Sequence, residues 1–423
     1  MSCNEWQKVK LGEVADILSG YAFKTKDFID EGIPVVKIKN IIPPNIDIND
    51  TQYVSNELYN EKIKFALNYN DVLISLNGSN INQLASAVGK IGRVRLKDKK
   101  LLLNQRVGKL YIVDEKRCNY DYLYYYLTQP EVRYNLAAMA GGSANQANIS
   151  PSQIKDIEIQ LPPLEEQEKI ANILSSLDDK IELNNEMNKT LEEMAQSIFK
   201  RWFVDFEFPN EDGEPYKSSG GEMIDSELGM IPKGWEVKCI YDLAEYINGT
   251  SFKAKDYSEK GLPIIKIAEL KNGITDGTKF FSGEKDKKFY LKNGDILFSW
   301  SGNPDTSIDT FIWDKGDAIL NQHIFKVIPK FDKGYAFTYL MLKYLKSTFT
   351  HIARNKQTTG LGHVTVKDLK ELKIALCFSK IKEFNEVAEP MVDLIFENNM
   401  SIEQLNKIRD SLLPKLMSGE IKV

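Results

Sequence analysis

The sequence predicts an α+β protein in which two pseudo-repeated globular α/β modules are separated by two long helices of the coiled-coil type. Two observations predict this: an internal duplication, and a heptad pattern of apolar residues after each copy. Residues 6–38 align with residues 235–267 at an ungapped shift of 229, with 11 identities in 33 positions. The identical pairs are Trp6/Trp235, Ala15/Ala244, Gly20/Gly249, Phe23/Phe252, Lys24/Lys253, Lys26/Lys255, Asp27/Asp256, Gly32/Gly261, Pro34/Pro263, Lys37/Lys266 and Ile38/Ile267.

The duplication extends through both halves of the chain. Residues 71–78 match residues 295–302 at a shift of 224, and Asn104-Gln105 recurs at a shift of 217. The helical tails, from about residue 170 and about residue 384, follow at a shift of 214. Because the shift falls from 229 to 214, the first module has about 15 additional loop residues while the ends of the modules stay aligned.

Each tail has the alternating three and four spacing of a coiled-coil seam. The predicted seam positions are Ile170, Ile173, Leu177, Lys180, Asn184, Met187, Leu191, Met194 and Ile198, and then Phe384, Val387, Met391, Leu394, Asn398, Ser401, Leu405, Ile408 and Leu412. Asn184 and Asn398 occupy the same heptad position, and a buried Asn in a seam costs stability but fixes the register. We therefore predict a registered helix pair, the alternative being two ordinary amphipathic core helices.

The first long helix is predicted from about Ile170 to Trp202, which corresponds to roughly 50 Å at 1.5 Å per residue. Pro390 lies inside the second pattern, where we expect it to kink the helix or to mark the start of its long segment. The two tails are therefore expected to be imperfectly symmetric.

A capping box precedes each long helix. Residues 150–153 (Ser-Pro-Ser-Gln) and residues 365–368 (Thr-Val-Lys-Asp) have this form, which predicts a short helix at each place. Strands are expected next, at residues 157–161 and 372–376.

Within the modules, short β-branched runs bounded by turn residues predict strands, for example at residues 34–39, 71–75 and 108–113. Helices are predicted at residues 120–128 and 335–346. The tyrosine-rich string at the start of the first helix is interpreted as core and interface packing rather than as a base-stacking platform, because helical spacing explains it.

The domain boundaries follow from these patterns. The predicted segments are a first globular module at 1–160, a central helical region at 161–206, a linker at 207–234, a second globular module at 235–376, and a C-terminal helical region at 377–423. The linker is expected to be extended, because residues 208–221 are rich in turn formers.

Composition bounds the class of protein. The formal net charge is −5, but residues 164–206 alone contain ten acidic and five basic residues, so the rest of the chain is near neutral. The four cysteines are far apart and form no ligand spacing with the three histidines, so we expect reduced thiols and neither a metal nor a cofactor. No apolar run approaches the length of a membrane span, and a cytoplasmic location without membrane contact is expected.

Polar loops recur after corresponding elements of the two modules. They lie at residues 77–83, 141–148, 301–306 and 355–363. Asn and Gln side chains can pair with adenine edges and Arg with guanine edges, so these loops are candidates for reading bases. The alternative for any single residue is that Gly, Asn and Ser simply form loops.

Three motifs resemble a known family. They are Leu161-Pro-Pro-Leu-Glu-Glu-Gln-Glu-Lys-Ile-Ala-Asn-Ile-Leu-Ser-Ser-Leu-Asp-Asp-Lys-Ile-Glu-Leu-Asn185, Phe199-Lys-Arg-Trp-Phe-Val-Asp-Phe206 and Ser226-Glu-Leu-Gly-Met-Ile-Pro-Lys-Gly-Trp235. With these motifs the chain resembles, over its whole length, the specificity subunit of type I restriction–modification enzymes. The second helical region departs from the pattern, with Cys377-Phe-Ser-Lys where the first has Pro162-Pro-Leu-Glu.

The resemblance implies that each module is a target recognition domain that reads one half of a bipartite, asymmetric sequence in double-stranded DNA. It implies that the two helices pair antiparallel and set the gap, and that two methyltransferase subunits and then restriction subunits dock on the chain. The chain itself is expected to be non-catalytic, and we find neither an Asn-Pro-Pro-Phe methyltransferase motif nor a Walker phosphate loop in it.

The candidate DNA-binding residues combine lysines for phosphates with amide, hydroxyl, Arg and His side chains for bases. The alternative for the paired lysines is that they are simply solvated surface. They are Lys24, Lys26, Asn77, Ser79, Asn80, Gln105, Arg106, Asn145, Gln146, Lys253, Lys255, Ser301, Asn303, Gln322, His323, Gln357, Thr358 and His363. Arg106 and His323 occupy equivalent places but differ, so the two halves are expected to read different bases.

Three other functions stay open at this point. One is the specificity subunit of a methylation-only or phage-defence methyltransferase system. The second is a nuclease or methyltransferase in its own right, which would need a catalytic constellation that the sequence does not offer. The third is a coiled-coil assembly scaffold that does not read DNA.

Overall fold

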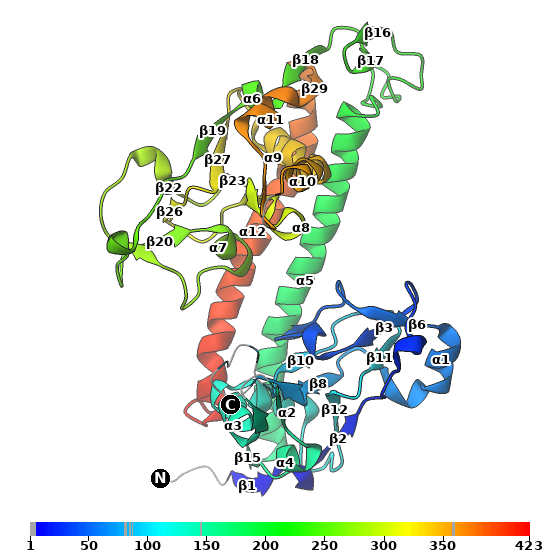
Figure 1. Ribbon diagram of the computed structural model, residues 1–423, viewed down its shortest axis with the longest axis vertical. Helices are drawn as coiled ribbons and strands as arrows, with labels where there is room; N and C mark the ends of the chain where they lie inside the picture. The colour runs from blue at the N-terminus through cyan, green and yellow to red at the C-terminus, as the bar shows by residue number, and fades with distance from the viewer. Residues whose placement is uncertain (1–5, 80–82, 84–85, 87, 144–145, 358–359) are drawn as a thin grey trace. The chain divides into compact units, whose positions relative to one another are not determined.

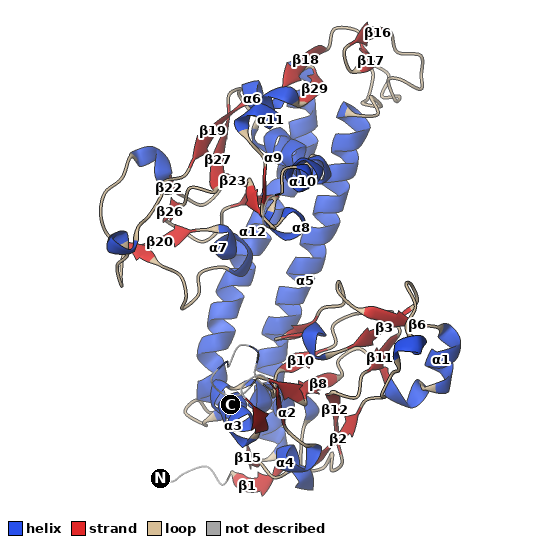
Figure 2. Cartoon of the chain, viewed as in Figure 1, coloured by secondary structure: helices blue, strands red, loops and turns tan. Residues whose placement is uncertain are grey.

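The computed structural model describes residues 6–79, 83, 86, 88–143, 146–357 and 360–423. The chain forms two compact units, one of Met1–Asp179 with Asn406–Val423 and the other of Lys180–Leu405. Each unit contains one globular module of mixed strands and helices together with part of both long helices (Figure 1, Figure 2).

The first module is built on two sheets. A six-stranded sheet has the order β2-β12-β8-β10-β5-β4, and a four-stranded sheet has the order β6-β3-β11-β7. The strands are β1 Gln7–Lys10, β2 Ala15–Ser19, β3 Ile33–Val36, β4 Ile41–Ile42, β5 Asn45–Ile46, β6 Gln52–Val54, β7 Ala66–Leu67, β8 Val72–Ser75, β9 Asn77–Gly78, β10 Ile91–Arg93, β11 Leu101–Leu103, β12 Val107–Ile112, β13 Gly141–Ser143, β14 Gln146–Asn148 and β15 Glu158–Leu161. The helices are α1 Asn56–Glu61, α2 Tyr120–Thr128, α3 Pro130–Met139 and α4 Pro151–Lys155.

The second module repeats this topology. Its four-stranded sheets have the orders β19-β27-β23-β25 and β21-β20-β26-β22, which correspond to β2-β12-β8-β10 and β6-β3-β11-β7. The strands are β16 Met223–Ser226, β17 Gly229–Pro232, β18 Glu236–Cys239, β19 Ala244–Asn248, β20 Leu262–Ile265, β21 Phe280–Phe281, β22 Tyr290–Leu291, β23 Ile296–Ser299, β24 Ser301–Gly302, β25 Asp309–Ile312, β26 Ala318–Leu320, β27 Ile324–Pro329, β28 Gly362–His363 and β29 Lys373–Leu376. The helices are α6 Ile240–Leu243, α7 Ile267–Asn272, α8 Pro304–Ser307, α9 Tyr335–Tyr344, α10 Lys346–Asn355 and α11 Val366–Glu371.

The long helices are equal in length. Helix α5 runs from Leu164 to Phe203 and α12 from Phe378 to Met417, which is 40 residues each and about 60 Å at 1.5 Å per residue. Both ends correspond at the predicted shift of 214. Helix α12 is continuous through Pro390, so the proline does not mark the start of the long segment.

The two helices pair antiparallel. Asp178 of α5 forms an ion pair with Arg409 of α12 in the first unit. In the second unit, Asn188 bonds to Asn398, and the Phe199 ring lies 6.0 Å from that of Phe384. The α12 number falls as the α5 number rises, which confirms the predicted antiparallel pair.

The seam differs from the prediction at every second position. The predicted positions that lie a multiple of seven residues from Asn184 or Asn398 face the partner helix or the module. Other predicted positions, such as Lys180 and Met194, do not, and the residue that follows each of them takes that place instead. In α5, Leu174 and Ala195 are fully buried, whereas Lys180 and Met194 are exposed. In α12, the predicted seam residues Val387, Leu394 and Ile408 are 43%, 37% and 46% exposed, while Ala388 and Ile395 are buried.

Asparagines form a polar layer in this seam. Asn398 donates to Asn188 and Asn188 donates to Asn399, both at 2.8 Å. Asn184 is 1% exposed, and neither atom of its amide has a hydrogen-bond partner among the described residues. The position of α12 that corresponds to Asn188 is Ile402, so the polar layer is not symmetric.

Each module shares one hydrophobic core with the helices. In the first unit, Ile170 and Leu174 of α5 and Leu416 of α12 are buried in one cluster with the strands β8 and β12. In the second unit, Phe199 of α5 and Phe384 of α12 are buried with the residues of α9. The helices are therefore integral to the folding of both modules.

Polar contacts reinforce this attachment. In the first unit, the Tyr125 hydroxyl donates to Asp178 at 2.7 Å. In the second unit, the Lys343 ammonium group lies 2.9 Å from Glu192 and 3.4 Å from Asp309. Burial alone would lower the pKa of Lys343, but Tyr339, Asp309 and Glu192 outweigh it and raise the pKa above its usual value. The bridging ammonium group therefore stays charged.

The structure confirms both predicted capping boxes. It also confirms the helix at residues 120–128, whose tyrosines are largely buried. The helix predicted at 335–346 ends earlier, at Tyr344, because Leu345 separates α9 from α10. The segment 208–221 is folded into turns rather than extended. Its Phe208 ring stacks on Tyr216 at 4.6 Å and on Trp235 at 5.0 Å.

Candidate nucleic-acid interface

Three polar segments of the first module meet at one place. The backbone N–H of Leu76 donates to Arg106 at 3.0 Å, and the N–H of Ile149 donates to Leu76 at 2.9 Å. Strand β9 pairs with β14, which places Asn77 opposite Asn148. The loop after β8, the β11–β12 turn and the β13–β14 hairpin therefore form one junction, although they are far apart in sequence.

The second module forms the same junction with the corresponding bonds. The N–H of Trp300 donates to His323 at 3.4 Å, and the N–H of Val364 donates to Trp300 at 2.8 Å. Strand β24 pairs with β28, with Ser301 opposite His363. The backbone frame is thus retained in both copies.

The exposure of the predicted site residues differs among them. The exposed residues among them are Gln105, Arg106, Gln322, His323, Asn303, Gln357, Lys24, Lys26, Lys253 and Lys255. The half-buried residues are Asn77, Ser79, Ser301 and His363. Asn80, Asn145 and Thr358 lie outside the described residues, and only the backbone of Gln146 is described. Gln105 and Arg106 on the β11–β12 turn, and Gln322 and His323 on the β26–β27 turn, are therefore accessible amide, Arg and His groups of the two junctions.

Some of these polar side chains also hold the junctions together. Asn77 donates to Asn148, and the Ser79 and Ser86 hydroxyls are 2.8 Å apart. Asn303 caps α8 by accepting from Asp305 and Thr306. These contacts agree with the loop-forming alternative for those residues.

Side chains diverge where the backbone frame is retained. Arg106 in the first junction corresponds to His323 in the second, and the buried Leu76 corresponds to the half-buried Trp300. The Trp300 indole donates to Asn248 at 3.0 Å and lies edge-on to His323 at 5.5 Å. The sequence prediction did not include Trp300, although its alignment with Leu76 marks it as a difference between the copies.

The predicted lysines lie on equivalent turns. In the first module, a 3-10 turn at Thr25–Asp27 follows Lys24, whose backbone N–H donates to the Asp27 carboxylate at 2.7 Å. In the second module, the turn at Ala254–Asp256 follows Lys253, whose backbone N–H donates to Asp256 at 2.7 Å. The first turn lies near its junction, because the N–H of Gln105 donates to the carbonyl of Tyr21 at 2.9 Å.

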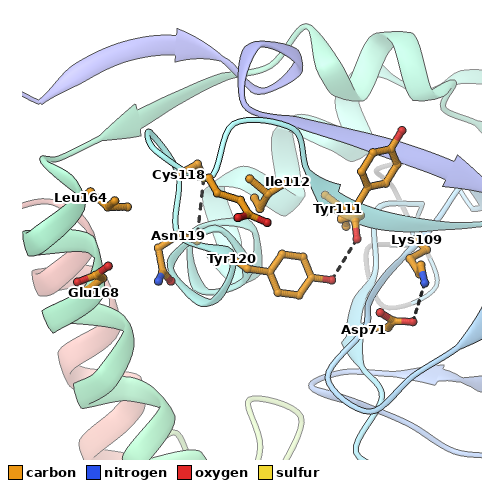
Figure 3. Close-up of a pocket in the computed structure, with 11 residues that line it drawn as sticks. Asp71, Lys109, Tyr111, Ile112, Cys118, Asn119, Tyr120, Leu164 and Glu168 are labelled. Atoms are coloured by element: carbon orange, nitrogen blue, oxygen red, sulfur yellow. Dashed lines mark hydrogen bonds and ion pairs between the residues drawn. The ribbon is translucent and has the colours of Figure 1, made fainter.

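Figure 3 shows a cavity of about 460 Å³ in the first module, between α2, β12 and the start of α5. Several of its polar groups are engaged: Lys109 pairs with Asp71 at 2.9 Å, and the Tyr120 hydroxyl donates to Leu110 at 3.1 Å. Burial raises the pKa of Cys118 to about 12, so its thiol stays protonated. The Lys109–Asp71 pair recurs as Lys326–Asp295, so this region forms part of the scaffold of both modules.

The described residues contain no group of His, Cys, Asp and Glu side chains that could hold a metal ion. No helix within the described part of the chain is both long enough and apolar enough to cross a membrane.

The comparisons with known proteins agree on one family. The type I restriction modification DNA specificity domain matches residues 4–193 and again residues 232–381. The type I restriction enzyme MjaIX specificity subunit of Methanocaldococcus jannaschii is 29% identical over 347 residues, which cover 80% of this chain and 77% of that protein. The type I restriction enzyme HindI specificity subunit of Haemophilus influenzae is 26% identical over 332 residues, which cover 64% of this chain and 71% of that protein.

A solved structure has the same fold. The crystal structure of a type I restriction–modification system S subunit from M. genitalium covers 98% of this chain and 97% of that one, with a TM-score of 0.59 at 17% sequence identity.

Proposed function

The chain belongs to the family of type I restriction modification DNA specificity domains, and we propose that it is the sequence-specific DNA-recognition subunit of a type I restriction–modification complex. Each module reads one half of a bipartite, asymmetric target in double-stranded DNA. The observation that carries this proposal is the duplicated junction: the backbone bonds are the same in both modules, while Arg106 is replaced by His323 and Leu76 by Trp300.

This arrangement suits two separate readers. Direct readout needs amide, Arg or His groups at the base edges, held on a backbone that places them reproducibly. Gln105 with Arg106, and Gln322 with His323, offer such groups on exposed turns. Because Arg and His present different donors, the two half-sites differ, and the target is asymmetric.

A module exchange tests the proposal. Residues 1–160 are replaced by the corresponding module of a relative, and the methylated sequence is read by single-molecule methylome sequencing in cells that contain the complete system. The expected result is one changed half-site and one unchanged half-site. A change in both half-sites would refute the assignment of one half-site to each module.

We further propose that the chemistry comes from partners, namely two methyltransferase subunits and restriction subunits, and that the chain alone is not an enzyme and acts in the cytoplasm. The names of the relatives support this, since they are specificity subunits of restriction enzymes. The purified chain is expected to methylate no DNA and to bind its target weakly. Addition of methyltransferase subunits should yield both activity and tight binding.

The helices offer a surface for these partners. Leu183 and Met194 of α5 are 50% and 47% exposed, and Val387 and Leu394 of α12 are 43% and 37% exposed. The first two are eleven residues apart and the second two seven apart, so each pair lies on one face of its helix. These four residues, which we call the apolar stripe, are exposed apolar side chains outside the seam, and exposed apolar surface marks interaction sites.

Charge placed on the apolar stripe tests docking. Met194→Glu and Leu394→Glu should weaken methyltransferase binding at least tenfold, about 1.4 kcal/mol, while the thermal midpoint of the free chain stays near that of the wild type. Lys189→Glu adds negative charge on a different face of α5 and serves as the control. Unchanged binding by both stripe variants, measured by calorimetry, would place the docking surface elsewhere.

A further inference from the structure

The internal duplication allows the two modules to be compared with each other. Positions that are identical in both copies either maintain the shared fold or perform a shared task. Positions that the fold explains can be set aside, and the remaining identities then indicate what both modules do alike.

The fold explains the repeated glycines. A Cβ on Gly20 would lie 2.3 Å from the carbonyl oxygen of Asn104, and one on Gly249 would lie 2.1 Å from that of Asn321. Gly32 and Gly261 have φ of +154° and +126°, which L side chains rarely adopt. These glycines are therefore required by close backbone approach or by backbone conformation.

Other repeated identities are also structural. Asp27 and Asp256 accept from the backbone N–H of Lys24 and Lys253. Ala15 and Ala244 are buried. The pairs Lys24/Lys253, Lys26/Lys255 and Lys37/Lys266 are different. Among the described residues, the one contact of their ammonium groups that recurs in both copies is that of Lys37 and Lys266 with an aromatic ring, and this contact leaves the positive charge without a paired anion.

The three lysines of each module lie on segments that contact each other. The Lys37 ammonium group lies 4.1 Å from the centroid of the Phe28 ring, and Phe28 immediately follows the turn that carries Lys24 and Lys26. In the second module, the Lys266 ammonium group lies 5.3 Å from the centroid of the Tyr257 ring, and Tyr257 follows the equivalent turn. We name these the lysine clusters: Lys24, Lys26 and Lys37 in the first module, and Lys253, Lys255 and Lys266 in the second.

The lysine clusters have positive charge without salt-bridge partners. Within the described ranges, none of the six lysines forms an ion pair with a carboxylate, although Lys37 donates to the neutral side chain of Gln52. Burial, followed by the neighbouring Lys39, lowers the pKa of Lys37, which agrees with a site that lacks a compensating anion. An external anion would supply that charge.

The first cluster adjoins the exposed turn that bears Gln105 and Arg106. The N–H of Gln105 donates to Tyr21, the Tyr21 ring lies 5.0 Å from Phe23, and the Phe23 ring lies 6.0 Å from Phe28. A short run of aromatic contacts thus joins the turn to Lys37. In the second module, the N–H of Thr250 donates to Leu320 at 3.0 Å, which places the start of that lysine loop beside its own turn.

We infer that the lysine clusters are the phosphate-binding elements common to both modules, and that Lys37 and Lys266 belong to them. This inference rests on the proposed function in DNA recognition. Phosphate contacts are independent of sequence and position the protein on the duplex, so they suit residues that stay identical while Arg106 and His323 diverge. Each cluster holds the backbone of its own half-site in the same way, and the neighbouring turn reads different bases.

The salt dependence of binding tests this inference. The assembled complex with methyltransferase subunits is titrated with target DNA at several salt concentrations. A triple variant, Lys24→Gln with Lys26→Gln and Lys37→Gln, should reduce the slope of log K against log salt by up to about 3, because each phosphate contact contributes about 0.9. The corresponding variant at Lys253, Lys255 and Lys266 should have the same effect, and binding to unrelated DNA should weaken in parallel.

Controls separate charge from folding. Lys8→Gln and Lys238→Gln remove lysines that pair with Glu158 and Glu236, and the slopes of these two variants should equal that of the wild type. Arg at the three cluster positions retains the charge and should restore most of the slope, and thermal midpoints report whether each variant folds. A folded triple glutamine variant with an unchanged slope, or one that alters the methylated sequence, would overturn the inference. A wild-type complex that does not distinguish its target from unrelated DNA would instead refute the proposed function.

Discussion

Asp368 shows how one carboxylate can determine the acid stability of a module. It is 5% exposed and caps helix α11 by accepting from the backbone and hydroxyl of Thr365, each at 2.7 Å, while it pairs with Lys356. Burial alone would raise its pKa, but the hydrogen bonds from Lys356 and Thr365 outweigh burial and hold the pKa below its usual value. A carboxylate whose pKa is lowered by folding stabilises the folded state at pH values above its pKa in the unfolded chain. This stabilisation is lost as the pH falls through the pKa that the group has in the folded chain.

Asp368→Asn should therefore destabilise the second module by about 1–3 kcal/mol near pH 7, since a charge-assisted pair is lost. Its thermal midpoint should approach that of the wild type as the pH falls below about 4. Gln153 occupies the equivalent cap position and is neutral, so the effect of Gln153→Ala should not depend on pH. A destabilisation by Asp368→Asn that is constant from pH 7 to pH 3 would contradict this account.

Residue-scale predictions from sequence succeeded where the determinants are local. The capping boxes at Ser150 and Thr365 depend on residues three apart, and both are confirmed. Trp300 was missed because its significance comes from neighbours that the fold brings together, Asn248 and His323. The site residues themselves stay predictions, because exposure shows that Arg106 is accessible and not what it binds.

Among the elements, the seam between α5 and α12 contains two asparagines with opposite environments. Asn188 bonds to both Asn398 and Asn399, whereas the buried Asn184 lacks a partner among the described residues. A buried amide without a partner costs free energy, and replacement by an apolar group of similar size removes that cost.

Asn184→Leu should therefore raise the free energy of unfolding by about 1–3 kcal/mol, while Asn188→Leu should lower it by a similar amount because two other amides lose their partner. Each variant is the control for the other, since both place the same side chain in the same seam. Denaturant unfolding measures the difference. If both substitutions stabilised the chain equally, the bonds of Asn188 would contribute no specificity to the seam.

The heptad pattern predicted the helices but not every seam position, and the reason is local. Several predicted positions are followed directly by another apolar residue, as in Ile173-Leu174, Met194-Ala195, Val387-Ala388 and Leu394-Ile395. Either residue of such a pair can be counted as the seam position, so the apolar pattern alone does not decide whether successive seam residues are three then four or four then three positions apart. Packing against the modules decides between them, and that information is tertiary.

At the scale of the whole molecule, both helices pass from one compact unit into the other, at Asp179/Lys180 and at Leu405/Asn406. An insertion of seven residues after Asp179 and another seven after Leu405 preserves the heptad phase and lengthens each helix by about 10 Å. Because duplex DNA rises about 3.4 Å per base pair, the unread gap between half-sites should grow by about three base pairs with both half-sites unchanged.

A single insertion in α5 alone should instead disturb the pairing with α12 and lower both stability and methylation. Methylome sequencing of cells with the double insertion reads the gap directly. A folded and active double insertion with the original gap would show that these helices do not set the spacing.

The equal helix lengths also have a genetic consequence. The modules differ by loop insertions, yet α5 and α12 both have 40 residues and correspond end to end at a shift of 214. A crossover between the two gene segments that encode these helices therefore stays in frame and in heptad phase wherever it falls within them. Unequal recombination would delete or duplicate one whole module and still leave intact helices at the junctions, so new combinations of half-sites can arise in one step.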